Sequence, residues 1–209
     1  AKQIGAGDYK FQDVNQDGKI DPNNDFVYLG DRTPKYTFNL NLGADWKGFD
    51  LNMLWNGAAK VQTVITGTIG EVGQYNNSPI ITYFRDNYWT KEGDTDVYFS
   101  RPLWQANNNL EPNSKDVHNA DYFRLKSLVF GYTLPSTLTN RIALNKVRVY
   151  FSGTNLLTLS SLMKNWGVDP EDAPVSGAWQ GLVGGETNAT RHIYPAQLKT
   201  FNFGINIQL

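Results

Sequence analysis

The stretch Thr200-Phe201-Asn202-Phe203-Gly204-Ile205-Asn206-Ile207-Gln208-Leu209 alternates strictly between small or polar and large apolar side chains. A period of two is typical of a β-strand, because successive side chains point to opposite faces. In a soluble sandwich the apolar face would pack on a core, whereas in a membrane barrel it would face lipid and the amides would face a polar lumen. The segment 196–209 is therefore predicted to be a strand. Whether it belongs to a sandwich or to a membrane barrel has to be judged from the other segments.

Four other segments are predicted to be strands. Residues 36–45 and 49–56 alternate on either side of a turn at Trp46-Lys47-Gly48, which predicts a hairpin, and further strands are expected at about 121–133 and 146–160. The last three predicted strands have about twelve residues or more, roughly twice the usual length in soluble proteins. Strands of this length fit a tilted membrane crossing.

The connections between the predicted strands alternate between short and long. If the last strand ends at the periplasm, both short connections lie there and both long ones lie outside the cell, as in outer-membrane barrels. The chain then divides into an extracellular loop (1–34), a hairpin (35–59), an extracellular loop (60–119), a strand pair (120–160), an extracellular loop (161–195) and a closing strand (196–209). The expected fold class is all-β: about five antiparallel, C-terminal strands of a large transmembrane β-barrel.

Composition narrows the alternatives. The net charge is -1, so no excess of positive charge favours nucleic-acid binding. The absence of cysteine excludes disulfides and thiolate zinc sites. The mean hydropathy is -0.46 and no run of about eighteen apolar residues occurs, so a membrane-spanning helix is excluded, but a barrel is not. Five strands are too few to close a membrane barrel. We therefore expect a fragment, with the remaining strands preceding Ala1.

The apolar phase changes within the segment 121–133. Phe123 and Leu125 are apolar in one phase, whereas Leu128, Phe130 and Tyr132 are apolar in the other. This change predicts either a β-bulge near residue 127 or a strand whose upper part rises above the bilayer. Arg124 and Lys126 are then expected to face the lumen.

A calcium-type motif lies near the N-terminus. The segment 13–21 reads D-x-N-x-D-G-x-I-D, which supplies oxygen ligands at alternate positions and a glycine for the sharp turn. The candidate Ca²⁺ ligands are Asp13, Asn15, Asp17, the Lys19 carbonyl, Asp21 and Asp25, which follows the position where an EF-hand has its glutamate. The alternative is an Asx-rich turn without metal.

No catalytic residues are predicted. His118 and His192 lie in the long loops without a serine, acid or second histidine at catalytic spacing. Asp169, Glu171 and Asp172 are close in sequence, but acidity in a loop more often marks a turn or a salt bridge than a glycosidase site. Four loop tryptophans are candidates for contact with a substrate or a lid protein, or else pack the loops together: Trp89, Trp104, Trp166 and Trp179.

The order of several motifs resembles the C-terminal part of SusC-like TonB-dependent transporters of Bacteroidetes, over nearly the whole chain. The matching segments are 7–11, 13–21, 29–30, 34–36, 46–51, 120–126, 130–135, 147–150, 153–157, 167–171, 194–195 and 203–205. One departure is the terminal Leu209, where many such barrels end in an aromatic residue.

The resemblance implies a multi-pass barrel in the bacterial outer membrane, surrounded by lipid and plugged by an N-terminal domain. It also implies a SusD-like surface lipoprotein as a lid, energy supplied through TonB, and import of glycans (oligosaccharides) or peptides. Two other classes stay open on the residues alone: a calcium-dependent carbohydrate-binding β-sandwich, and a surface hydrolase that uses the acidic residues at 169–172.

Overall fold

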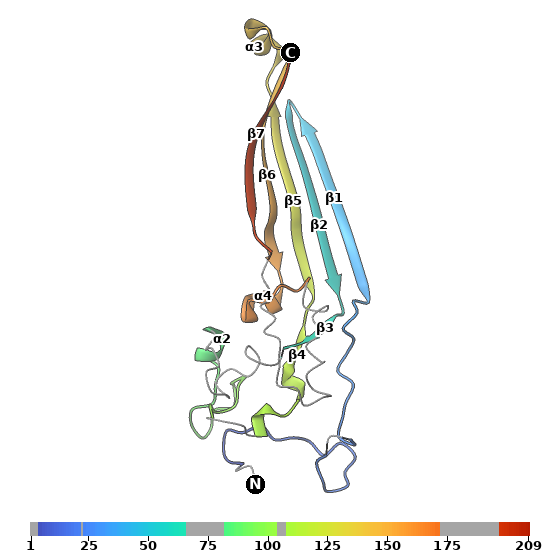
Figure 1. Cartoon of the computed structure of the whole chain (residues 1–209), viewed down its shortest axis with the longest axis vertical. Coiled ribbons are helices and arrows are strands. Elements are labelled where there is room, and N and C mark those ends of the chain that lie inside the picture. The colour runs from blue at the N-terminus through green and yellow to red at the C-terminus, as the bar shows by residue number, and fades with distance from the viewer. Residues whose placement is uncertain (1–3, 22, 66–81, 104–107, 172–196) are drawn as a thin grey trace, which may run out of the picture.

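The computed structural model describes residues 4–21, 23–65, 82–103, 108–171 and 197–209. Its main feature is a five-stranded antiparallel sheet in the order β1-β2-β5-β6-β7 (Figure 1). The strands are β1 (Tyr36–Trp46), β2 (Phe49–Ala59), β5 (Tyr122–Thr133), β6 (Lys146–Leu159) and β7 (Thr200–Gln208). Each strand pairs with the next long strand in the chain, which confirms the predicted antiparallel arrangement.

The two ends of the sheet differ in their connections (Figure 1). At one end, called here the turn end, lie the two-residue β1–β2 turn, the connection 134–145 and the C-terminus. The β1–β2 turn is tight because Lys47 and Gly48 both have positive φ, 47° and 90°, as a primed hairpin turn requires. The other end, called the loop end, carries the connections 60–121 and 160–199 and the N-terminal segment.

The sheet has one apolar and one polar face. Because side chains alternate along each strand and the register runs across all five strands, residues of one kind form rows. One apolar row contains Ala44, Leu51, Phe130, Phe151 and Phe203. The adjacent row on the opposite face contains Gly43, Asn52, Val129, Ser152 and Asn202.

The apolar face is exposed. Phe130, on the central strand β5, is 45% exposed, and Phe203 on the edge strand β7 is 84% exposed. A sandwich would cover this face with a second sheet, and no such sheet lies on it within the described ranges. The structure therefore disfavours the sandwich alternative.

The predicted β-bulge lies beside Ser127. Opposite β2, Leu54 pairs with Ser127 and Trp55 with Leu125, so that Lys126 is left out of the register. The same residue is skipped opposite β6, where the register also jumps across positions 155 and 156. The bulge explains why the apolar phase of the sequence changes within β5.

Short elements at the loop end enclose a separate small core. They are β3 (Gln62–Val64), α2 (Thr82–Arg85), η1 (Asn108–Leu110), η2 (Ser114–Asp116), β4 (Val117–Asn119) and α4 (Ser161–Trp166). β3 and β4 pair as an antiparallel ribbon. The core combines aliphatic side chains with the buried aromatic rings of Phe84, Phe99 and Trp166, and partly buried tyrosines pack against it. The connection 60–119, expected only as a loop, thus contains its own ordered elements.

The connection at the turn end contains two short helices, α3 (Ser136–Thr139) and η3 (Asn140–Ile142). Among the described residues, no helix is long and apolar enough to cross a membrane.

Candidate functional site

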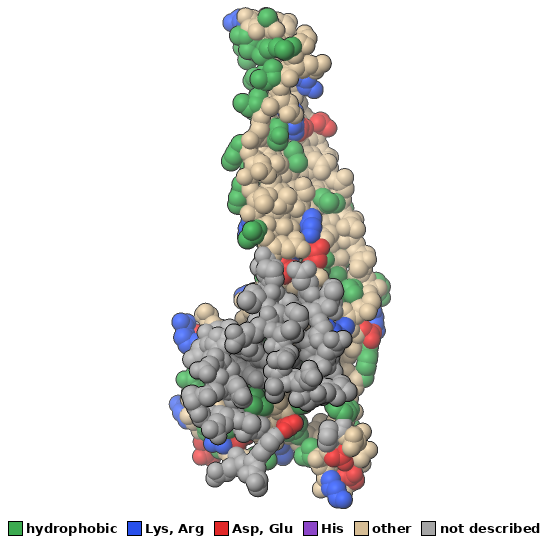
Figure 2. Space-filling view, in the orientation of Figure 1, with side chains coloured by type: hydrophobic (Ala, Val, Ile, Leu, Met, Phe, Trp, Pro, Cys, Tyr) green, Lys and Arg blue, Asp and Glu red, His purple; other side chains and the backbone are tan. Residues whose placement is uncertain are grey.

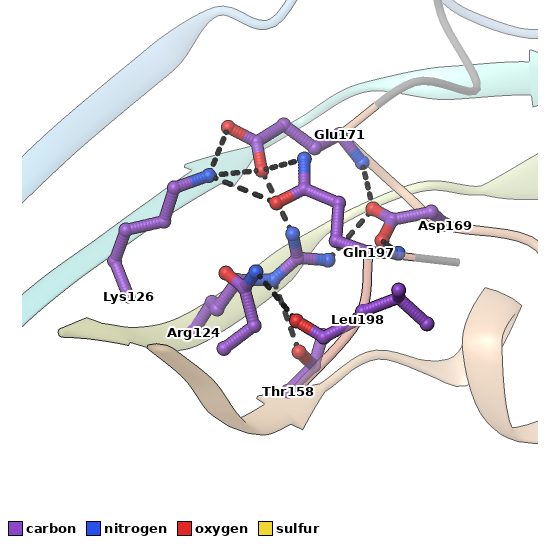
Figure 3. Close-up of polar contacts among 8 residues, drawn as sticks. Arg124, Lys126, Thr158, Asp169, Glu171, Gln197 and Leu198 are labelled. Atoms are coloured by element: carbon purple, nitrogen blue, oxygen red, sulfur yellow. Dashed lines mark hydrogen bonds and ion pairs between the residues drawn. The ribbon is translucent and has the colours of Figure 1, made fainter. Parts of the chain in front are cut away.

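Arg124 is the centre of a buried ion-pair cluster at the loop end of the polar face (Figure 3). Its side chain lies in the row of Asn56 and Thr158 and is fully buried. The guanidinium donates to Asp169 Oδ1 at 2.6 Å, to Glu171 Oε2 at 2.8 Å and to Thr158 Oγ1 at 3.0 Å. A buried charge is stable only when it is paired in this way.

Lys126 and Gln197 complete the cluster, which we call the Arg124 cluster. Lys126 Nζ donates to both carboxylate oxygens of Glu171, at 3.0 and 2.8 Å, and to Gln197 Oε1 at 3.1 Å. Gln197 Nε2 donates in turn to Glu171 Oε2 at 2.9 Å. The cluster consists of Arg124, Lys126, Thr158, Asp169, Glu171 and Gln197.

Asp169 binds backbone as well as side-chain groups. Its Oδ1 accepts from the backbone N–H of Glu171 and its Oδ2 from that of Gln197, both at 3.0 Å. Burial raises the pKa of Asp169, but these two backbone hydrogen bonds and the guanidinium of Arg124 outweigh burial and hold the pKa below its ordinary value of 3.8. Asp169 is therefore an ionised acceptor and not a poised general acid.

The bulge makes this geometry possible. In a regular strand Lys126 would be followed by an outward-facing residue, but the bulge lets Lys126 and Ser127 both turn to the polar side. A second irregularity on β6 lies opposite, where Asn155 has a positive φ of 53° and donates to the carbonyl of Leu198 at 3.2 Å. The two bulges thus bring both cations and the start of β7 to one place.

The Arg124 cluster joins two parts of the chain that are distant in sequence. Asp169 and Glu171 precede the stretch 172–196, and Gln197 follows it. All three are bound to cations that project from β5. Two cations and two carboxylates balance, and their contacts hold the ends of this connection on the polar face.

Sequence reasoning found part of this site. It predicted that Arg124 and Lys126 share the lumen side and that the acidic stretch 169–172 marks a turn or a salt bridge. In the structure both cations lie on the polar face, and Asp169 and Glu171 form salt bridges with them. Asp172 lies outside the described residues. Thr158 and Gln197 were missed, because a neutral side chain at a strand end carries no signal in one sequence. Arg124 and Lys126, two cations on the same face of one strand, could have indicated this site, because buried cations require anionic partners nearby.

A second buried ion pair fixes the N-terminal segment at the loop end. Asp8, whose side chain is 1% exposed, accepts two hydrogen bonds from Arg101 at 2.9 Å and one from Asn109 Nδ2 at 2.9 Å. Burial raises the pKa of Asp8, but these bonds outweigh it and lower the pKa below 3.8. Gly7 lies against Trp89, since a side chain there would overlap the indole ring.

The calcium-type segment forms an exposed loop closed by its own side chains. Asp13 Oδ2 accepts from the backbone N–H of Gly18 at 2.8 Å, and its Oδ1 accepts from that of Gln16 at 2.7 Å. Asp25 accepts from the backbone N–H groups of Val14 and Asp21, both at 2.8 Å.

The remaining predicted ligands lie in the same loop. Asn15 and Asp17 hydrogen-bond each other, and Asp17 also accepts from the backbone N–H of Lys19. Within the part of the chain that the structure describes, no three His, Cys, Asp or Glu side chains are grouped around one metal position. The donors suit a hard cation chemically, and in this structure their oxygens bind amides.

The loop tryptophans and histidines singled out in the sequence have different surroundings. Trp166 is 9% exposed and packs in the loop-end core, with its ring centroid 4.4 Å from that of His118, so it has the packing role and leaves no face for a ligand. Trp89 is half-buried beneath the N-terminal segment. Trp104, Trp179 and His192 lie outside the described residues. Burial lowers the pKa of His118 to about 4, so that it packs as a neutral ring.

An open antiparallel sheet with one exposed apolar face and one polar face is consistent with a wall segment of a membrane β-barrel, and the described sheet is not closed. No protein-family model matches the chain. It is 33% identical to TonB-dependent receptor P3 of Formosa agariphila over 162 residues, which are 77% of this chain and 15% of the relative.

Two further comparisons agree. TonB-dependent receptor P26 of the same organism is 25% identical over 204 residues, covering 97% of this chain and 20% of the relative. The closed-closed RagAB peptide importer has the same fold, with a TM-score of 0.57 and 23% identity over 91% of this chain and 20% of that one. The chain thus spans a fifth or less of these relatives, and it is a segment of a TonB-dependent receptor.

Proposed function

We propose that this chain forms part of the wall of an outer-membrane importer of the TonB-dependent, SusC-like type and has no enzymatic activity. The observation that carries the proposal is the exposed apolar face, which runs along all five strands of the sheet. Burying this face in lipid removes apolar area from water, whereas leaving it in water would make the sheet prone to aggregate. In this arrangement the loop end is extracellular and the turn end is periplasmic.

The polar face is proposed to line the lumen. Its rows carry neutral hydrogen-bonding groups, among them Asn39, Asn41, Asn52, Ser152 and Asn202. Amides and hydroxyls bind both sugar hydroxyls and peptide groups, so the proposed cargo is a glycan or a peptide. The solved neighbour is described as a peptide importer, which supports a peptide as a candidate.

The same proposal includes partners. A SusD-like lipoprotein is expected as a lid over the loop end, as the two-component neighbour RagAB suggests, and TonB is expected to act through parts of the protein outside this chain. Ca²⁺ is proposed to bind the loop 13–25, where the donors are all oxygen atoms.

Extraction and uptake test the proposed function. The intact receptor should stay in the membrane pellet in high salt and in alkaline carbonate and dissolve only with detergent. Release into the carbonate supernatant would sink the barrel proposal and favour a soluble binding module. Deletion of the gene should abolish uptake of one class in a panel of labelled oligosaccharides and peptides. Unchanged uptake across both classes would contradict the proposed import function.

A further inference from the structure

The connection 134–145 at the turn end exposes two large apolar side chains. Leu138 is 51% exposed and Ile142 is 64% exposed, and they are four residues apart in a continuous helical segment formed by α3 and η3. Residues at this spacing lie on the same side of a helical segment. Figure 2 shows hydrophobic side chains gathered at the end of the molecule that carries this connection.

The connection folds back on the apolar side of the sheet. Val147 belongs to the apolar face, in the row of Ile207, yet it is only 7% exposed while Ile207 is 59% exposed. α3 contacts β6, Thr139 is buried, and the backbone N–H of Leu134 donates to the Val147 carbonyl at 2.9 Å. Val147 is therefore covered by this connection, and the two exposed side chains continue the apolar face beyond the strands.

The charged side chains within the connection and at the start of β6 are all of one sign. Residues 134–146 contain no acidic residue, whereas Arg141 and Lys146 are exposed. At the same end, Lys47 lies over the ring of Trp46, with Nζ 4.8 Å from its centroid, and Trp46 is 67% exposed. An exposed Trp next to cations is typical of the boundary between acyl chains and headgroups.

We propose that the connection 134–145 is an interfacial lipid anchor, in which Leu138 and Ile142 enter the acyl boundary and Arg141 and Lys146 bind lipid phosphates. Two features favour lipid over a protein partner. The exposed pair is continuous with the apolar face, and the flanking cations complement anionic headgroups. The anchor rests on the proposed function, because it requires that the apolar face lie in a bilayer.

Spin labels can locate the two side chains directly. The chain has no cysteine, so Leu138→Cys and Ile142→Cys each give one label in it, with any cysteine elsewhere in the intact receptor replaced by serine. The labelled receptor is reconstituted into vesicles of phosphatidylethanolamine and phosphatidylglycerol. Labels at both positions should collide readily with oxygen and poorly with a water-soluble nickel chelate. Ser136→Cys and Thr137→Cys, exposed on the same connection, are the matched controls and should show the reverse.

A further label at Phe203→Cys separates the anchor from the barrel proposal. If this label faces lipid while those at positions 138 and 142 meet the nickel chelate as freely as the controls, the anchor is wrong and the barrel stands. Labels at 138 and 142 that collide with neither reagent would show burial against protein and also overturn the anchor. If the Phe203 label itself meets the nickel chelate, the proposed function fails with it.

Discussion

At the scale of single residues, Arg124 is expected to contribute most to the stability of the loop end. Its side chain is fully buried, so water cannot replace its carboxylate partners. Its guanidinium contacts both Asp169 and Glu171, and water does not reach it. An exposed pair in the same chain offers a contrast: Arg85 and Asp86 also form an ion pair at 2.9 Å, but both side chains are mostly exposed. Exposed pairs contribute about 0–1 kcal/mol, whereas breaking a buried one costs about 3–5 kcal/mol.

We therefore expect Arg124→Gln to loosen the Arg124 cluster. The buried carboxylate of Asp169 would lose its charged partner, so the free energy of local opening should fall by about 3–5 kcal/mol. The backbone N–H groups of Glu171 and Gln197 report this opening, because both donate to Asp169. Hydrogen exchange of these two amides in the intact receptor measures the change. Arg85→Gln is the control, and equal exchange in the two variants would contradict the role given to Arg124.

The pH dependence of the cluster follows from Asp169. Its pKa lies below 3.8 because backbone hydrogen bonds and Arg124 outweigh the effect of burial. A carboxyl group with a lowered pKa in the folded state contributes stability that is present above the unfolded value and lost as pH falls through the folded pKa. Exchange of the Glu171 and Gln197 amides, corrected for intrinsic rates, should stay slow from about pH 7 to about pH 4 and accelerate only below that. Loss of protection already near neutral pH would argue against an ionised Asp169.

At the scale of elements, the long strands could be predicted from the sequence, but the short strands and the side-chain contacts between distant segments could not. Alternation over ten positions predicted β1 and β7, alternation over eight positions predicted β2, and the phase change within β5 gave the bulge as one of two alternatives. β3 and β4 have three residues each, which is too short for a period of two to be distinguished from chance. The pairing of Arg124 with Asp169 depends on a contact between residues 45 positions apart, for which local patterns give no information.

Gly131 on β5 leaves room for the side chain of Arg148 to pass over this strand. Arg148 on β6 reaches over it to Asp50 on β2, with hydrogen bonds of 2.8 and 2.5 Å. A Cβ at Gly131 would lie 2.6 Å from Cζ of Arg148, closer than atoms approach without a shift. Gly131→Ala should therefore displace the guanidinium of Arg148 from Asp50, and losing this partly exposed ion pair should reduce stability by about 0–1 kcal/mol. Denaturant unfolding of the receptor in detergent micelles measures the effect.

Gly43 on β1 is the matched control for Gly131. A Cβ there would meet its nearest atoms at 3.8 Å, an ordinary contact. Gly43→Ala should leave the unfolding midpoint nearly unchanged. A midpoint shift of the same size in both variants would mean that the crossing of Arg148 over β5 does not matter.

The loop 13–25 should respond to calcium if its oxygen donors coordinate the ion. Ca²⁺ would draw the carboxylates of Asp13, Asp17 and Asp21 from backbone amides toward one centre and stiffen the loop. Calorimetric titration of the intact receptor should give a dissociation constant of about 10⁻⁴–10⁻³ M, as for extracellular modules. The double variant Asp13→Asn, Asp17→Asn should abolish the heat. Asp45→Asn, outside the loop, serves as control, and absence of binding by the native protein would leave only an Asx-rich turn.

At the scale of the whole molecule, the sheet separates two environments, and the cost of a charge should depend on where it is placed. Phe203 lies on the apolar face in the middle part of β7, Ile207 lies on the same face near the turn end, and Asn202 lies on the polar face. In a membrane barrel an Arg or Lys facing lipid costs about 2–4 kcal/mol at the midplane and about 0–1 kcal/mol near the interface. A soluble core would penalise both apolar positions without regard to depth.

We therefore expect Phe203→Lys to destabilise the receptor by about 2–4 kcal/mol, Ile207→Lys by about 0–1 kcal/mol, and Asn202→Lys to be tolerated, because that side chain lies on the face proposed to line a water-filled lumen. Reversible unfolding in urea in the presence of lipid vesicles measures all three on one strand. The order of the three costs is the decisive result. Equal costs at 203 and 207 would point to a buried protein core on this face, and a large cost at 202 alone would mean that the two faces have been assigned the wrong way round.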